Sequence, residues 1–158
     1  MSYFRTARNC ELSLLYYLEQ SVKADWSGIT VVKTFASAYS KDVALPIICS
    51  HLAQTNTTRL EIGNNTLENR YLMVIDIFAT SDGQLIDLAD YVKGKLATGW
   101  VHYDHSHASG QPATLVRDAN GRDYVTEFIN DSKIEIMGSS ESKDSYRQNI
   151  SVLVRKSS

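Results

Sequence analysis

The stretch Arg70 to Trp100, RYLMVIDIFATSDGQLIDLADYVKGKLATGW, decides the fold that the sequence predicts. It opens with an apolar run from Tyr71 to Ala79, in which successive side chains would point to opposite faces of a strand. Both sets of side chains are apolar apart from Asp76. The run therefore predicts a strand in the middle of a sheet, covered on both faces.

After this run the hydrophobic period changes from that of a strand to that of a helix. Apolar residues recur at helical spacing at Leu85, Leu88, Ala89, Val92 and Leu96. Ser81 and Gln84 fit a capping box at the start, and Gly99 follows as a stop. The strand, the tight turn and the helix form a scaffold without the appearance of an active site.

Outward from this unit, the pattern predicts one further helix, ending near Lys23, and several strands. The strands are expected at 29–35, 45–52, 57–62, 100–104, 124–129, 133–137 and 146–155. At 158 residues the chain is expected to form a single domain, 1–158. The order of elements predicts an α+β fold, with two helices packed on a mostly antiparallel β-sheet.

Residues 105–123 differ from the rest because they are polar and rich in turn-forming residues. We expect a protruding β-hairpin or long loop there. Within it, Asp118 to Gly121 predicts a tight turn, with Gly121 at positive φ. Polar excursions of this length from a compact domain are usually functional.

Composition excludes several classes of protein. The formal net charge is −2, so the chain lacks the overall basicity that is typical of nucleic-acid-binding proteins. The sequence contains no run of eighteen apolar residues, so we expect no membrane-spanning helix. The N-terminus does not resemble a signal peptide. Two cysteines are too few for a disulfide scaffold. We expect a soluble protein with free thiols in a reducing cytoplasm.

A histidine-rich segment is the sharpest candidate for chemistry. His102, Asp104, His105 and His107 lie within six residues and are types that bind transition metals. On a strand, however, His102 and Asp104 would face one side and the other two histidines the opposite side. A further ligand such as His51 would have to come from elsewhere. We therefore expect no metal and no cofactor, and a small metal-binding α+β enzyme remains an alternative.

Two other candidates are weaker. Cys49 and His51 would share a strand face, but Cys49 lies in an apolar run where thiols usually pack inertly. Asp76, in the central strand, is expected to pair with a basic or backbone donor rather than to act as a perturbed acid. No nucleotide-binding or hydrolase motif is present, so the sequence predicts a protein without enzymatic activity.

The segment from Arg59 to Ser106 resembles small structural proteins of tailed bacteriophages. The likeness lies in a strand of the type RYxxxIDIFA, a short turn, and a helix of the type LADxVxxxL, with an LPIIC-like strand before and a YRxxIxVxV strand after. The family it resembles most is that of the tail-terminator (tail-completion) proteins of long-tailed phages. The resemblance implies a hexameric ring that caps the head-proximal end of the tail tube, stops its polymerisation and joins the head connector.

This resemblance also implies the partners and the location. They are further copies of the chain, the tail tube protein and a head-completion or connector protein, in the phage virion after assembly in the host cytoplasm. Genomic DNA would pass through the lumen without specific binding, and no membrane is involved. A head-closure or head–tail adaptor protein is the alternative, and a nucleic-acid-binding accessory protein would rest on the two arginines of 105–123 alone.

Assembly contacts are expected in two polar excursions, 105–123 and the Gly63–Asn69 turn, because partners usually bind such segments. The residues chosen are Asn64, Asn65, Thr66, His105, His107, Arg117, Asn120 and Arg122.

Overall fold

The computed structural model describes residues 6–60, 67–107, 115–134 and 143–157, with the backbone alone at 106–107 and 115–118. Six strands form one sheet in the order β1-β2-β3-β6-β5-β4, in which β1 and β2 are parallel and the other neighbours antiparallel. The elements are α1 (Thr6–Asp25), β1 (Thr30–Val32), α2 (Phe35–Ala38), β2 (Ile47–Arg59), β3 (Leu67–Phe78), α3 (Asp82–Ala97), β4 (Trp100–His107), β5 (Leu115–Ile134), the 3₁₀ helix η2 (Lys143–Tyr146) and β6 (Arg147–Ser157).

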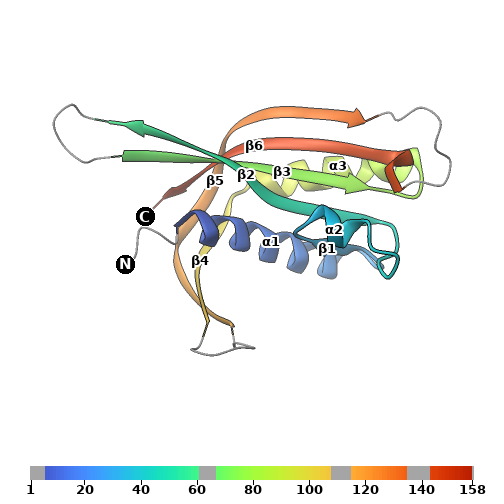
Figure 1. The fold of residues 1–158 in the computed structure, drawn as a ribbon, viewed down its shortest axis with the longest axis horizontal. Coiled ribbons are helices and arrows are strands. Elements are labelled where there is room, and N and C mark those ends of the chain that lie inside the picture. Colours follow the sequence, from blue (N-terminus) through green and yellow to red (C-terminus); the bar gives the residue numbers. More distant parts are fainter. Residues whose placement is uncertain (1–5, 61–66, 108–114, 135–142, 158) are drawn as a thin grey trace.

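The predicted fold class, α+β with two helices on a mostly antiparallel sheet, is wrong. The protein is predominantly β, and its six-stranded mixed sheet curls into a half-barrel that carries three α-helices (Figure 1). The third helix, α2, has four residues, too few to give a periodic signal. Residues 47–52 and 57–59 of two predicted strands belong to one strand, β2, and residues 124–129 and 133–134 of two others belong to β5.

The central unit was predicted correctly. β3 pairs with β2 on one side and with β6 on the other. Ser81 caps α3 by accepting a hydrogen bond from the Gln84 amide, and all five residues of the predicted stripe are buried. Gly99 follows the helix with φ of 71°. One detail differs: the Gln84 side chain accepts from the backbone of Thr80 rather than from that of Ser81.

The main core lies between the sheet and two helices, α1 and α3. Met73, Ile75 and Ile77 from β3 are fully buried there, against helix residues such as Leu14 and Leu88. The opposite face carries a smaller cluster under α2, which includes Phe78 and Cys49. On this second face of β3 Phe78 is fully buried, whereas Leu72 and Val74 are half-buried.

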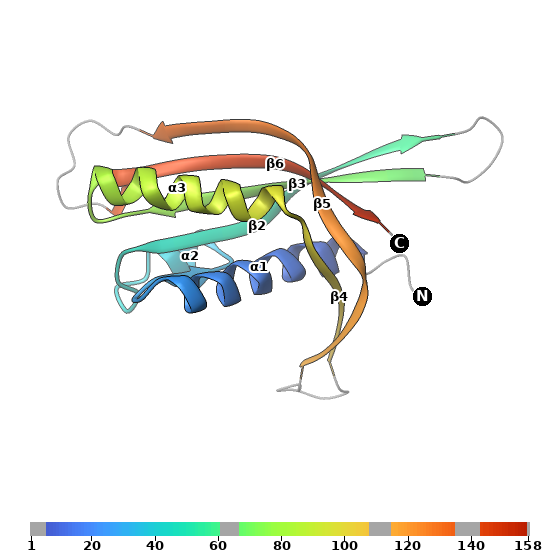
Figure 2. The ribbon, with the colours of Figure 1, turned by 180° about the vertical axis from the view of Figure 1, so that it is seen from behind.

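The curl of the sheet is produced by β5. Its second half pairs with β6 along the body, while its first half turns away and pairs with β4 (Figures 1 and 2). Register shifts on both sides of this strand mark bulges, which bend a strand and increase its twist. Gly121 sits at one of them with φ of 94°. Its positive φ was predicted, but the tight turn at 118–121 was not correct, since these residues lie within β5.

Two antiparallel ribbons extend beyond the body (Figures 1 and 2). The β2–β3 arm consists of Ala53–Arg59 and residues 67–70, and the β4–β5 arm of residues 104–107 and 115–118. The β4–β5 arm corresponds to the hairpin expected at 105–123, with His107 paired to Leu115. The predicted Gly63–Asn69 turn lies largely outside the described residues.

Candidate functional site

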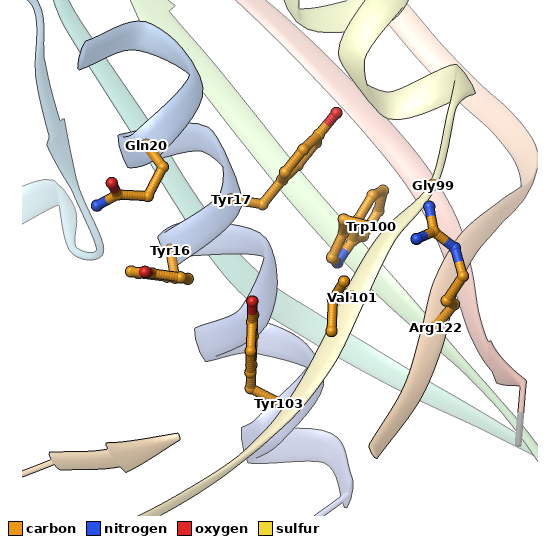
Figure 3. A pocket seen from close by; sticks show the side chains of 8 residues that line it. All are labelled: Tyr16, Tyr17, Gln20, Gly99, Trp100, Val101, Tyr103 and Arg122. Atoms are coloured by element: carbon orange, nitrogen blue, oxygen red, sulfur yellow. The ribbon is translucent and has the colours of Figure 1, made fainter. Parts of the chain in front are cut away.

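A pocket of about 310 Å³ opens where the β4–β5 ribbon leaves the body, between α1 and the start of β4. Figure 3 shows its lining, which is mainly aromatic: Tyr16, Tyr17, Trp100 and Tyr103, with Gln20 and Arg122 as the polar members. We call it the aromatic pocket. Tyr16, Tyr17 and Gln20 come from α1, the other two rings from β4, and Arg122 from β5.

The rings of the aromatic pocket are held in place. Tyr17 stacks on Trp100 with ring centroids 5.6 Å apart and planes at 14°. Its hydroxyl donates to the Lys95 carbonyl oxygen at 3.0 Å. Tyr16 meets Tyr103 edge to face, also at 5.6 Å. Contacts of this kind position the rings before anything binds, so the pocket is preformed.

Arg122 supplies the positive charge at this pocket. The guanidinium donates to the Thr98 carbonyl oxygen at 3.3 Å and is otherwise exposed. Among the described residues, the lining contains no cysteine, serine, histidine or carboxylate. Its chemistry is that of a binding surface for an apolar or aromatic group, with a cation beside it.

The structure separates the residues chosen as assembly contacts. Asn64, Asn65 and Thr66 lie outside the described residues, and for His107 and Arg117 only the backbone, in the β4–β5 arm, is described. Asn120 is half-buried, and Arg122 borders the aromatic pocket.

His105 is placed in the interior. It is 2% exposed, and its Nε2 lies 3.3 Å from the Ser13 hydroxyl on α1. The His105 side chain supports the packing of α1 on β4 and does not lie on the exposed surface of this chain.

Among the side chains that the structure describes, the histidine segment does not assemble a ligand set of its own. His102 and His105, which were expected on opposite faces of the strand, are both buried. The carboxylate of Asp104 accepts a hydrogen bond from Asn9 instead. His102 contacts two residues that sequence reasoning passed over, Cys10 and Asp123.

Asp76 pairs with a basic donor, as predicted. Its Oδ1 accepts from Arg147 Nη2 at 3.0 Å and Nε at 3.2 Å, and from Asn149 at 3.2 Å. The guanidinium lies 5.2 Å from the Phe35 ring centroid and 5.1 Å from that of Phe78. The pair therefore closes one end of the sheet, and its role is structural.

Cys49 and His51 do not form a nucleophile–base pair. Burial, with a contribution from Asp76, raises the pKa of Cys49 to about 11, which keeps the thiol protonated at neutral pH. The His51 ring packs edge to face on Phe35. Among the described residues, no hydrogen bond joins Cys49 to His51.

The aromatic pocket was not foreseen from the sequence. Trp100 is about eighty positions from Tyr16 and Tyr17 in the sequence. Nothing in either segment alone indicates that these side chains meet. The chain contains nine tyrosines, a residue type that is enriched at interfaces, but their number does not locate a site.

No protein-family model matches this chain, and no curated protein matches its sequence. Within the part of the chain that the structure describes, no helix has the length and apolar character needed to cross a membrane.

Proposed function

We propose that this chain is a structural protein of a phage neck, a tail terminator that forms a ring on the head-proximal end of the tail tube. The ring stops tube polymerisation and joins the tube to the head connector. The proposal is supported by the resemblance over Arg59 to Ser106, a segment that contains all of β3 and α3 and nearly all of β4.

The observation that carries the proposal is the β2–β3 arm. Every residue from Ala53 to Arg59 is exposed, so this part of β2 is uncovered on both faces. A two-stranded ribbon without cover is marginally stable in water. Near its end, Leu60 and Leu67 are each about half exposed. Such a ribbon gains stability when a second chain covers it.

A closed ring needs two different and complementary patches on each subunit. We assign the β2–β3 arm to the contact between subunits, where it lies on the body of the next copy. The aromatic pocket and the β4–β5 arm are assigned to the tube or connector protein. Preformed aromatic pockets are typical anchor sites at protein interfaces.

The test compares two variants that shorten one arm each. In the first, Asn-Gly replaces residues 57–69 and joins Asn56 to Arg70, which are register partners. In the second, Asn-Gly replaces residues 106–116 and joins His105 to Arg117, also register partners. This second replacement leaves Gly121 and its bulge in place. Both use a turn that suits two-residue hairpins.

Native mass spectrometry and negative-stain images of purified protein give the readout, repeated with tail tubes present. We expect rings from the wild-type chain, monomers from the first variant, and rings that fail to cap tubes from the second. Rings from the first variant, as abundant as those of the wild type, would refute the assignment of the β2–β3 arm. Binding to portal rings without binding to tubes would identify a head–tail adaptor instead.

A further inference from the structure

Three ligand-type side chains converge in the interior, beside α1 and away from the aromatic pocket. The Cys10 sulfur lies 3.7 Å from Nδ1 of His102 and 3.5 Å from Oδ1 of Asp123. Nδ1 of His102 lies 3.0 Å from both carboxylate oxygens. The ligand atoms of these three side chains all lie within 4.8 Å of one another, which is close enough for them to share one metal ion.

Each member comes from a different element. Cys10 lies on α1, His102 on β4 and Asp123 on β5. The exposed fractions are 0%, 2% and 0%. His102 lies at the single register shift between these two strands, opposite Gly121, and Asp123 follows two positions later.

The distances match those of a tetrahedral metal site. Zinc binds sulfur at about 2.3 Å and nitrogen or oxygen at about 2.0–2.2 Å. At tetrahedral angles these lengths place sulfur about 3.6 Å from nitrogen and about 3.5 Å from oxygen, and nitrogen about 3.3 Å from oxygen. The observed separations are 3.7, 3.5 and 3.0 Å. All three atoms are therefore placed to bind one ion with little movement.

The orientation of the histidine argues against a catalytic triad. In a triad, the nucleophile and the orienting carboxylate contact opposite nitrogens of the ring. Here the thiol and the carboxylate both approach Nδ1. Three donors that meet at one point suit an ion between them better than a proton relay.

Charge gives a second, independent reason. Asp123 is fully buried, and among the described residues its ion-pair partner is His102 alone. A divalent cation would displace the thiol proton and balance the charges of one thiolate and one carboxylate, with a neutral histidine as the third ligand. The ion would leave no net charge in the core.

We propose that Cys10, His102 and Asp123 form a structural site for a zinc-like divalent ion, which ties α1 to the base of the β4–β5 ribbon. Three protein ligands leave the fourth tetrahedral position to a ligand from solvent. The site is independent of the proposed neck function, because it concerns how α1 is fastened to the sheet.

Cobalt provides the test, since a cysteine thiolate bound to Co²⁺ gives a charge-transfer absorption that oxygen and nitrogen ligands do not. The chain has two cysteines, so Cys49→Ala is the matched control. Chelator-treated, reduced wild-type protein and the Cys49→Ala variant are titrated with Co²⁺ and then with Zn²⁺. We expect the band to saturate at one equivalent in both proteins and to disappear as Zn²⁺ replaces Co²⁺.

Cys10→Ser should lose the band, and Zn²⁺ should raise the melting temperature of the wild-type chain but not that of this variant. If Cys10→Ser does not fold, the band in Cys49→Ala still decides, because Cys10 is then the sole thiol. Absence of the band from Cys49→Ala would overturn the proposal. So would cobalt binding without a thiolate band, which would place the ion away from Cys10.

Discussion

The hydroxyl of Ser13 on α1 lies 2.9 Å from the amide nitrogen of Tyr103 and 3.3 Å from the carbonyl oxygen of the same residue. It accepts from the first and donates to the second. β4 is an edge strand, whose outward groups would otherwise lack partners. The Asn9 side chain accepts a hydrogen bond from the amide of His105 in the same way. Glu11 accepts from the Leu52 amide of β2 at 2.7 Å. Helix α1 thus serves as the missing neighbour across the open side of the half-barrel.

Ser13→Ala is therefore expected to destabilise the fold by about 1–3 kcal/mol, because it leaves a buried amide and carbonyl of Tyr103 unpaired. Urea unfolding followed by circular dichroism measures the loss. Ser21→Ala is the control, since Ser21 lies on the same helix and is bonded to Tyr91 through its carbonyl oxygen rather than its hydroxyl. Equal losses in the two variants would show that α1 does not cap the edge in this way.

Arg147 is the second position with a large expected effect. Its removal would leave the Asp76 carboxylate, 0% exposed, without its counter-ion. Loss of one member of a buried pair costs about 3–5 kcal/mol, and we expect this for Arg147→Leu in the same unfolding assay. In the double variant Asp76→Leu, Arg147→Leu, most of that loss should be recovered, because no charge is then buried.

Arg155 is the matched control for this prediction. It also lies on β6 and pairs with Glu68 at 3.1 Å, but its side chain is 41% exposed. Exposed pairs contribute less than about 1 kcal/mol, so Arg155→Leu should change stability little. If Arg147→Leu were as mild as Arg155→Leu, the carboxylate of Asp76 would have to reach solvent or another donor.

Local pattern was enough to predict β3 and α3, and distant contacts explain what was missed. The apolar run at Tyr71–Ala79 and the stripe of α3 lie within single elements, so periodicity reveals them. The curl of the sheet depends on bulges in β5, and His102 and His105 are both buried although strict alternation would separate them. Cys10 and Asp123 are 113 positions apart, and no sequence pattern brings them together.

Glycines 99 and 94 should respond in opposite directions to replacement by alanine. Gly99 has φ of +71°, and an added Cβ would lie 3.0 Å from the Asp123 carbonyl oxygen. A left-handed conformation alone costs about 1–2 kcal/mol for other residues. Gly94 lies inside α3, where an added Cβ meets nothing within 4 Å, so Gly94→Ala should stabilise by about 0.5–1 kcal/mol. Melting temperatures of the two variants give the comparison, and a rise for Gly99→Ala would contradict the geometry at the start of β4.

The two cysteines allow the opening of α1 to be separated from the opening of the sheet. Burial raises the pKa of both thiols, to about 11 for Cys49, so near neutral pH neither is a thiolate in the folded chain after treatment with a chelator. We expect both to resist an aromatic disulfide reagent until the region around them opens. Labelling of Cys49→Ala reports on Cys10 in α1, and labelling of Cys10→Ser reports on Cys49 in β2. Helix α1 closes the half-barrel through side-chain contacts and not through a ladder of backbone hydrogen bonds. Cys10 should therefore react faster than Cys49. The difference in rate should be larger when the Ser13→Ala substitution is also present. Equal rates at both positions would mean that α1 and the sheet open as one cooperative unit.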